Sequence, residues 1–79
     1  MDELKKLRGE IDKIDEKLSK LLKKRVKIIK EISEHKRKNS IPTTNKNREE
    51  EIFSKLESDF EKNIFKKIIE ESKKVQKGF

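Results

Sequence analysis

LKKLRGEIDKIDEKLSKLLKKRVKIIKEI, residues 4–32, places apolar residues alternately three and four positions apart. That spacing is the heptad stripe of a long amphipathic helix, and Leu22 and Ile29 widen it on one side. It predicts one helix from about residue 3 to about residue 38, roughly 54 Å long at 1.5 Å per residue. Because nothing else in a chain of 79 residues can cover both ends of such a rod, a second copy of the helix is the expected cover.

The composition is that of a small chain with little material for a core of its own. Hydrophobic residues make up 29% of it and charged residues 49%. Cysteine is absent, which excludes a disulfide scaffold and a thiolate zinc site, and a single histidine leaves little for any other metal site. No apolar run exceeds two residues, so neither a membrane span nor a signal peptide is expected. We expect a cytoplasmic protein without a metal or cofactor.

After the long helix, the sequence predicts a loop and two shorter helices. Residues 38–45, KNSIPTTN, collect turn formers and the one proline of the chain. Thr44 or Asn45 can cap a second helix. Ser58 and Glu61 form a capping box that opens a third helix, which is expected to end near Gly78 and to carry the apolar stripe Phe65, Ile68, Ile69 and Val75. No strand pattern is present, so the prediction is an all-α, three-helix protomer with one domain over residues 1–79.

Two cations lie on the face that the long helix should bury. Arg25 occupies an a position in the middle of the heptad stripe, where an unpaired charge is costly. This position is consistent with three roles for Arg25. It could form a buried ion pair, set the register of paired helices, or bind a ligand in a cavity. Lys36 lies three turns later on the same face, roughly 16 Å along the axis. Taken alone it is more simply explained as a solvated lysine.

The two later helices carry further polar residues on their apolar faces. Arg48 and Glu49 each precede an apolar residue by one turn on the second helix, and Asn45 precedes Glu49 by one turn. Ser72 and Gln76 continue the stripe of the third helix. Each has an ordinary structural explanation, but together they predict a cationic, amide-containing pocket for a polycarboxylate. Such a pocket, without a nucleophile–base pair or a glycine-rich phosphate loop, catalyses by positioning and electrostatics.

The chain resembles the all-helical chorismate mutases of the short monofunctional type. The resemblance lies in the ordered residues Arg8-Gly9-Glu10-Ile11-Asp12, Arg25, Ile32-x-x-x-Lys36, Ile41-Pro42-x-x-Asn45-x-x-Arg48-Glu49 and Ser72-x-x-x-Gln76. It covers nearly the whole chain and needs no gap between Arg8 and Glu49. It implies an intertwined homodimer with shared active sites and an isomerase, an intramolecular transferase, that converts chorismate to prephenate by a Claisen rearrangement on the shikimate route to Phe and Tyr.

The resemblance also implies a role for each site residue. Lys36 and Gln76 would hydrogen-bond the ether oxygen of the substrate, where negative charge grows as the C–O bond breaks. The carboxylates would be held by Arg25 from one protomer, by Arg8 from the other, and by Arg48. Glu49 would bind the substrate hydroxyl, and Ser72 and Asn45 would be further contacts. Two features depart from the family: Asn45 stands where an aspartate is common, and the connection from Leu56 to Phe60 is shorter by roughly two helical turns.

Three other functions remain open on the sequence. An isochorismate pyruvate-lyase would use a similar cationic pocket, although Gln76 favours the mutase. A basic helical module that binds nucleic acid would suit the net charge of +7, but lysines alternate with glutamates and aromatic residues are few. A ligand-free helical dimer leaves Arg25 and Gln76 unexplained. We therefore expect chorismate as the partner molecule and a second copy as the partner chain, with neither nucleic acid nor membrane.

Overall fold

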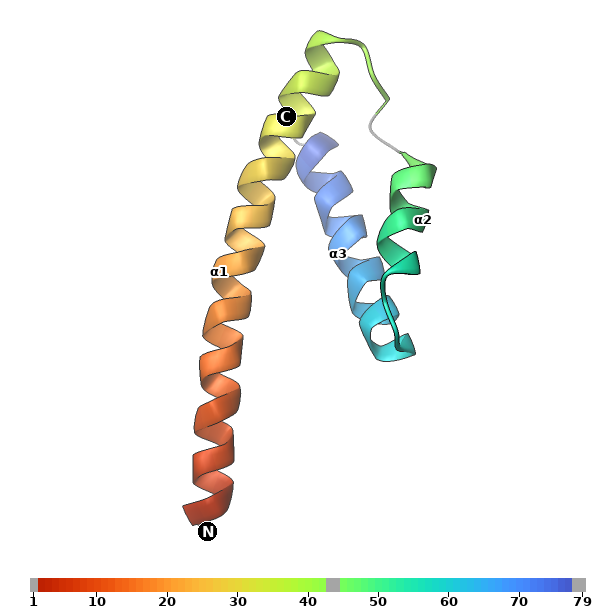
Figure 1. Cartoon of the computed structure of the whole chain (residues 1–79). Coiled ribbons are helices and arrows are strands. Elements are labelled where there is room, and N and C mark those ends of the chain that lie inside the picture. Colours follow the sequence, from red (N-terminus) through yellow and green to blue (C-terminus); the bar gives the residue numbers. More distant parts are fainter. Residues whose placement is uncertain (1, 43–44, 78–79) are drawn as a thin grey trace.

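The computed structural model describes residues 2–42 and 45–77. They form three helices: α1 (Asp2–Lys38), α2 (Lys46–Ser54) and α3 (Asp59–Lys77) (Figure 1). This confirms the predicted all-α class, the very long first helix and the order of the elements. Thr44, the alternative cap of α2, and Gly78, the predicted end of α3, lie outside the described residues.

The chain reverses direction directly after α1 because that helix ends in a Schellman motif. Ser40 adopts a left-handed conformation, with φ of 54°. The Ile41 amide donates to the Lys36 carbonyl at 2.8 Å, and the Ser40 amide donates to the Arg37 carbonyl at 3.4 Å. These two bonds satisfy carbonyls that the end of a helix otherwise leaves unpaired. The motif therefore turns the chain back within a few residues of Lys36.

Both predicted caps are present on the shorter helices. The Asn45 side chain accepts a hydrogen bond from the Arg48 amide at 3.1 Å and begins α2. At the start of α3, the Ser58 hydroxyl accepts from the Glu61 amide at 3.2 Å, and the Glu61 carboxylate accepts from the Ser58 amide at 3.0 Å. These reciprocal bonds are the capping box. Each short helix is thus started by its own local sequence.

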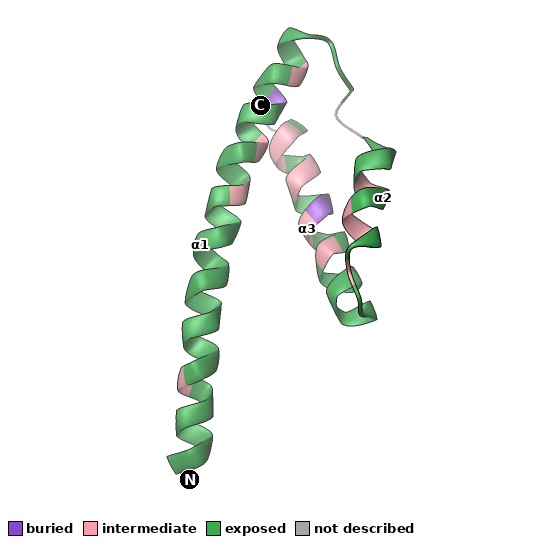
Figure 2. Cartoon of the chain, in the orientation of Figure 1, coloured by how far each residue is buried: buried purple, intermediate pink, exposed green. Residues whose placement is uncertain are grey.

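The protomer is open: α1 is a rod, α3 packs against its C-terminal half, and α2 packs on α3 (Figure 1). The chain measures 56 × 24 × 15 Å, and its radius of gyration is 16.2 Å, against about 12 Å for a compact chain of this length. Its accessible surface is 7166 Å², whereas a compact 9.5 kDa protein exposes about 5,000 Å². Among the described residues only Ser33 and Ile69 are buried (Figure 2).

An apolar stripe on α1, interrupted at Arg25, stays exposed in the single protomer. Its side chains are 41–63% exposed, far above what a packed core allows: Leu4, Leu7, Ile11, Ile14, Leu18, Leu21, Ile28 and Ile32. Monomeric proteins rarely expose contiguous apolar patches of such extent. The stripe therefore indicates an oligomer. In the described part of the chain, no helix has the length and apolar character needed to cross a membrane.

Candidate active site

A cavity of about 410 Å³ lies where the C-terminal half of α1 faces α2 and α3. All three helices and the residue that caps α2 contribute to its wall. Seven of the eight residues singled out from the sequence line it: Arg25, Lys36, Asn45, Arg48, Glu49, Ser72 and Gln76. The apolar part of the wall consists of Ile28, Ile29, Ile32, Ile52 and Ile69. The fold thus gathers residues that lie far apart in the sequence.

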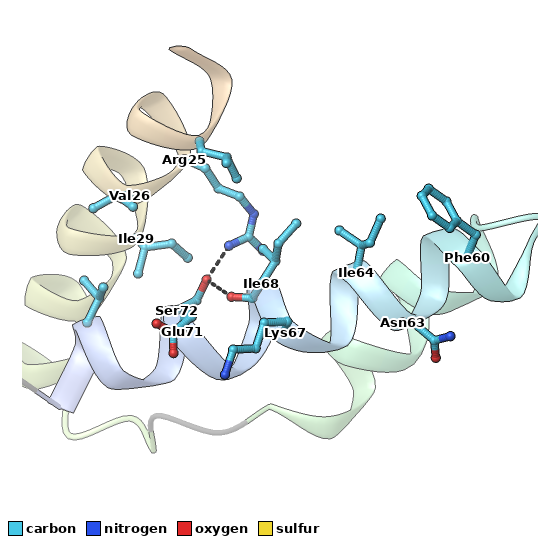
Figure 3. Close-up of a pocket in the computed structure, with 12 residues that line it drawn as sticks. Arg25, Val26, Ile29, Phe60, Asn63, Ile64, Lys67, Ile68, Glu71 and Ser72 are labelled. Atoms are coloured by element: carbon cyan, nitrogen blue, oxygen red, sulfur yellow. Dashed lines mark hydrogen bonds between the residues drawn. The ribbon is translucent and has the colours of Figure 1, made fainter. Parts of the chain in front are cut away.

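Arg25 is joined to α3 through a hydroxyl group. Its guanidinium donates a hydrogen bond to the Ser72 hydroxyl, which in turn donates to the Ile68 carbonyl at 2.7 Å (Figure 3). Burial, and then the positive charge of Arg48, lower the pKa of the Arg25 guanidinium. An arginine stays protonated in a protein, so both effects oppose its charge without removing it. An anion placed beside Arg25 and Arg48 would relieve that cost.

Gln76 is held at both ends by residues one turn apart on α1. Lys36 Nζ donates to Gln76 Oε1 at 3.5 Å, and the Ser33 hydroxyl donates to the Gln76 backbone carbonyl at 3.3 Å. Because an ammonium group only donates, it must face the amide oxygen. The Gln76 amide nitrogen then remains a donor for a ligand in the cavity. Lys36 is half-buried here, so its explanation as a solvated lysine is wrong.

The α2 residues face two ways. Arg48 pairs with Glu51 on its own helix at 3.1 Å, with both side chains largely exposed. Glu49 points to α3 instead and pairs with Lys73 at 3.2 Å, with side chains 26% and 33% exposed. Asn45 lines the cavity, but its side-chain oxygen is engaged by the helix cap. Among the described residues, the wall of the cavity carries four cations and one carboxylate: Arg25, Lys36, Arg48, Lys73 and Glu49.

Two residues of this region were missed by the sequence analysis, Ser33 and Lys73. Lys73 follows the buried Ile69 by one helical turn, so its place on the packed face of α3 was a usable signal. Among nineteen lysines that signal was not distinctive. Ser33 is only 6% exposed because α3 crosses α1 beside it. Nothing in the heptad pattern marks that crossing point.

Arg8 does not reach the cavity within this protomer. It is exposed near the start of α1, about 25 Å along the helix axis from Arg25. This agrees with the expectation that one straight helix cannot bring both arginines to one small ligand. Among the described residues, no three His, Cys, Asp or Glu side chains gather in a way that could hold a metal ion.

A second, apolar cavity of about 590 Å³ lies between α1 and α3 (Figure 3). Leu22, Val26 and Ile29 line it from α1, and Phe60, Ile64, Ile68 and Val75 line it from α3. Arg25, Ile29 and Ser72 line both cavities and so stand on the wall between them. Phe60 is 75% exposed. This apolar cavity continues the exposed stripe of α1.

The chain is similar to one family of known proteins. The family model described as "Chorismate mutase type II" matches residues 7–77. A curated relative, "Bifunctional chorismate mutase/prephenate dehydratase" of Aquifex aeolicus (strain VF5), is 50% identical over 56 residues, which cover 71% of this chain and 16% of the relative. The chain thus matches about a sixth of the length of that bifunctional protein. No solved structure matches significantly.

Proposed function

The chain belongs to the chorismate mutase type II family, and from this premise we propose that it converts chorismate to prephenate in the cavity of about 410 Å³. One observation carries the proposal: Arg25, Lys36, Arg48 and Gln76 line a single cavity although they come from three helices. Cations and an amide donor around isoleucines suit a small dicarboxylate with an apolar body.

The two guanidinium groups supply the binding step. Arg25 is half-buried, and the nearby charge of Arg48 disfavours its protonated state. A substrate carboxylate offsets this repulsion and can accept two parallel N–H bonds from one guanidinium. Binding the dianion is therefore favoured because its negative charge offsets the repulsion between the two guanidinium groups.

Lys36 and Gln76 supply the catalytic step. In the rearrangement the ether C–O bond breaks while a C–C bond forms in the same molecule, so no atom is gained or lost. No protein group forms a covalent bond with the substrate. Negative charge grows on the ether oxygen as the C–O bond lengthens. The Lys36 ammonium and the Gln76 amide nitrogen would be the two donors to that oxygen. The 3.5 Å contact between Lys36 Nζ and Gln76 Oε1 supports this, and donors aimed at developing charge lower the barrier.

The reaction also requires the two reacting ends of one molecule to meet. A cavity that holds both carboxylates keeps the substrate in that folded conformation. The binding energy then offsets the entropy lost when the two reacting ends are brought together. Glu49, whose carboxylate lines the wall, would accept the hydrogen bond of the substrate hydroxyl. Ser72 would contact the substrate while it holds Arg25.

The active unit is a homodimer in this proposal. A second copy of α1 can pack against two apolar surfaces of this chain, the exposed stripe of α1 and the apolar cavity between α1 and α3. The protomer exposes about 2,000 Å² more surface than a compact chain of its mass, enough for a stable interface. Antiparallel pairing would bring Arg8 of one chain towards Arg25 of the other, in an isologous arrangement.

The direct test is to mix the purified protein with chorismate and follow the loss of the ultraviolet absorbance of chorismate. We expect prephenate from the wild type and none above background from Arg25→Ala, with helix content checked by circular dichroism. A parallel reaction with isochorismate detects the alternative lyase by pyruvate release. Turnover of isochorismate alone would overturn the mutase assignment. Inertness towards both, together with salt-sensitive DNA binding, would instead favour a nucleic-acid-binding module.

A further inference from the structure

We infer that Lys73 is a positioning residue of this site: it holds the Glu49 carboxylate away from the arginines, so that they stay available to the substrate. The inference rests on the proposed function and names a residue that the family resemblance did not supply. It is carried by one contact between helices. Lys73 Nζ on α3 lies 3.2 Å from Glu49 Oε2 on α2, and both side chains line the cavity.

The burial of this ion pair separates it from ordinary surface pairs. The Lys73 and Glu49 side chains are 33% and 26% exposed. The pair Lys74–Glu71, one residue further along α3, is shorter at 2.8 Å, but it lies within one helix and its side chains are 70% and 54% exposed. Water screens exposed pairs of that kind, so they contribute little. The half-buried pair is less screened and fixes its carboxylate more firmly.

The reason for such a pair lies in the composition of the cavity wall. Glu49 shares the wall with Arg25, Lys36 and Arg48, and a carboxylate there is itself a ligand for the guanidinium groups. Left without a partner, Glu49 would compete with the carboxylates of the substrate for those arginines. Lys73 engages Glu49 Oε2 and leaves Oε1 for the substrate hydroxyl. It thereby keeps the arginines available to the substrate.

The defining variant is Lys73→Met, which keeps most of the aliphatic stem and removes the charge. We expect its KM for chorismate to rise about tenfold, the effect of losing one hydrogen bond to a charged group, while kcat changes less than about twofold. Lys73→Arg should restore a KM near the wild-type value. The matched control is Lys74→Met, which removes a lysine that pairs with Glu71 outside the cavity of about 410 Å³ and should leave both constants unchanged.

A double-mutant comparison separates positioning from simple loss of fold. Glu49→Gln removes the charge that Lys73 holds, so adding Lys73→Met to it should not raise KM further. A merely structural role would lower the active fraction and hence kcat, with KM unchanged. That pattern, or a further rise of KM in the double variant, overturns the inference. An inactive wild type overturns the proposed function along with it, whereas an active wild type with an unaffected Lys73→Met overturns the inference alone.

Discussion

Lys36 Nζ lies 3.5 Å from Gln76 Oε1, and this contact joins the last turn of α1 to the last turn of α3. Ser33, one turn before Lys36, donates to the backbone carbonyl of the same glutamine at 3.3 Å. That carbonyl belongs to the end of a helix, where no intrahelical partner is available. The two contacts lie where the end of α3 meets α1, and the register of α3 on α1 determines where both donors of the proposed reaction lie.

Replacing Lys36 by alanine should abolish measurable catalysis and leave the fold intact. The variant loses one of two donors at the oxygen that becomes negative, which typically costs about 10²–10³ in rate, or roughly 3–4 kcal/mol. Steady-state turnover of chorismate measures the loss. Lys38→Ala, at the exposed end of α1, is the control and should retain activity. Wild-type turnover by Lys36→Ala would remove Lys36 from the site.

Replacing Gln76 by glutamate should make the activity depend strongly on pH. An amide donates to the ether oxygen at any pH, whereas a carboxyl group donates only when protonated. Activity of Gln76→Glu should therefore persist in acid and fall as the introduced acid ionises. The pH profile of kcat/KM measures this, with the wild type as reference. A flat profile at the wild-type level would contradict the role of Gln76.

Arg8 and Arg25 should serve one ligand from different chains. Homodimers of Arg8→Ala and of Arg25→Ala should each be nearly inactive. When equal amounts are unfolded and refolded together, half of the dimers are mixed, and one of the two sites in each mixed dimer carries neither defect. Activity should therefore recover to about one quarter of the wild-type value, given random pairing and independent sites.

The mixing experiment gives a different result if the site lies within one chain. If both arginines served a site within one chain, every site in the mixture would carry one defect and activity would stay at the parental level. Mass spectrometry of the refolded dimers establishes that mixed species have formed. No recovery in their presence would contradict the shared site.

The α3 capping box should make stability depend on pH. Hydrogen bonds from the Ser58 side chain and then its backbone amide lower the pKa of Glu61. A lowered folded-state pKa gives stability that is present above the unfolded value of about 4.3 and is lost as pH falls through the folded value. Glu61→Gln keeps the capping geometry without the charge, so it should melt roughly 1–3 °C lower at neutral pH and equal to the wild type in acid.

Thermal unfolding followed by circular dichroism from pH 7 down through the acid range measures this difference. Glu50→Gln, at an exposed position of α2, is the control for the loss of a surface charge. A melting difference between Glu61→Gln and the wild type that stays constant across this range would mean that ionisation of Glu61 is not its cause.

The helices were predictable from local patterns alone. Heptad spacing marked α1, and Asn45 and the Ser58–Glu61 box marked the starts of α2 and α3, because caps and helical periodicity are short-range interactions. Polar residues at buried helix positions marked Arg25 and Gln76, since such positions are costly without a partner. The family resemblance, carried by site residues that occur in the same order along the chain, added the expected role of each.

Which side chains actually meet was a question for the tertiary structure. No spacing along one helix shows that Lys73 contacts Glu49 or that Ser33 is buried. These facts depend on the angle and register with which α3 crosses α1 and α2 packs on α3. Packing of many weak contacts sets that register, so it is a property of the assembled helices and of no single segment.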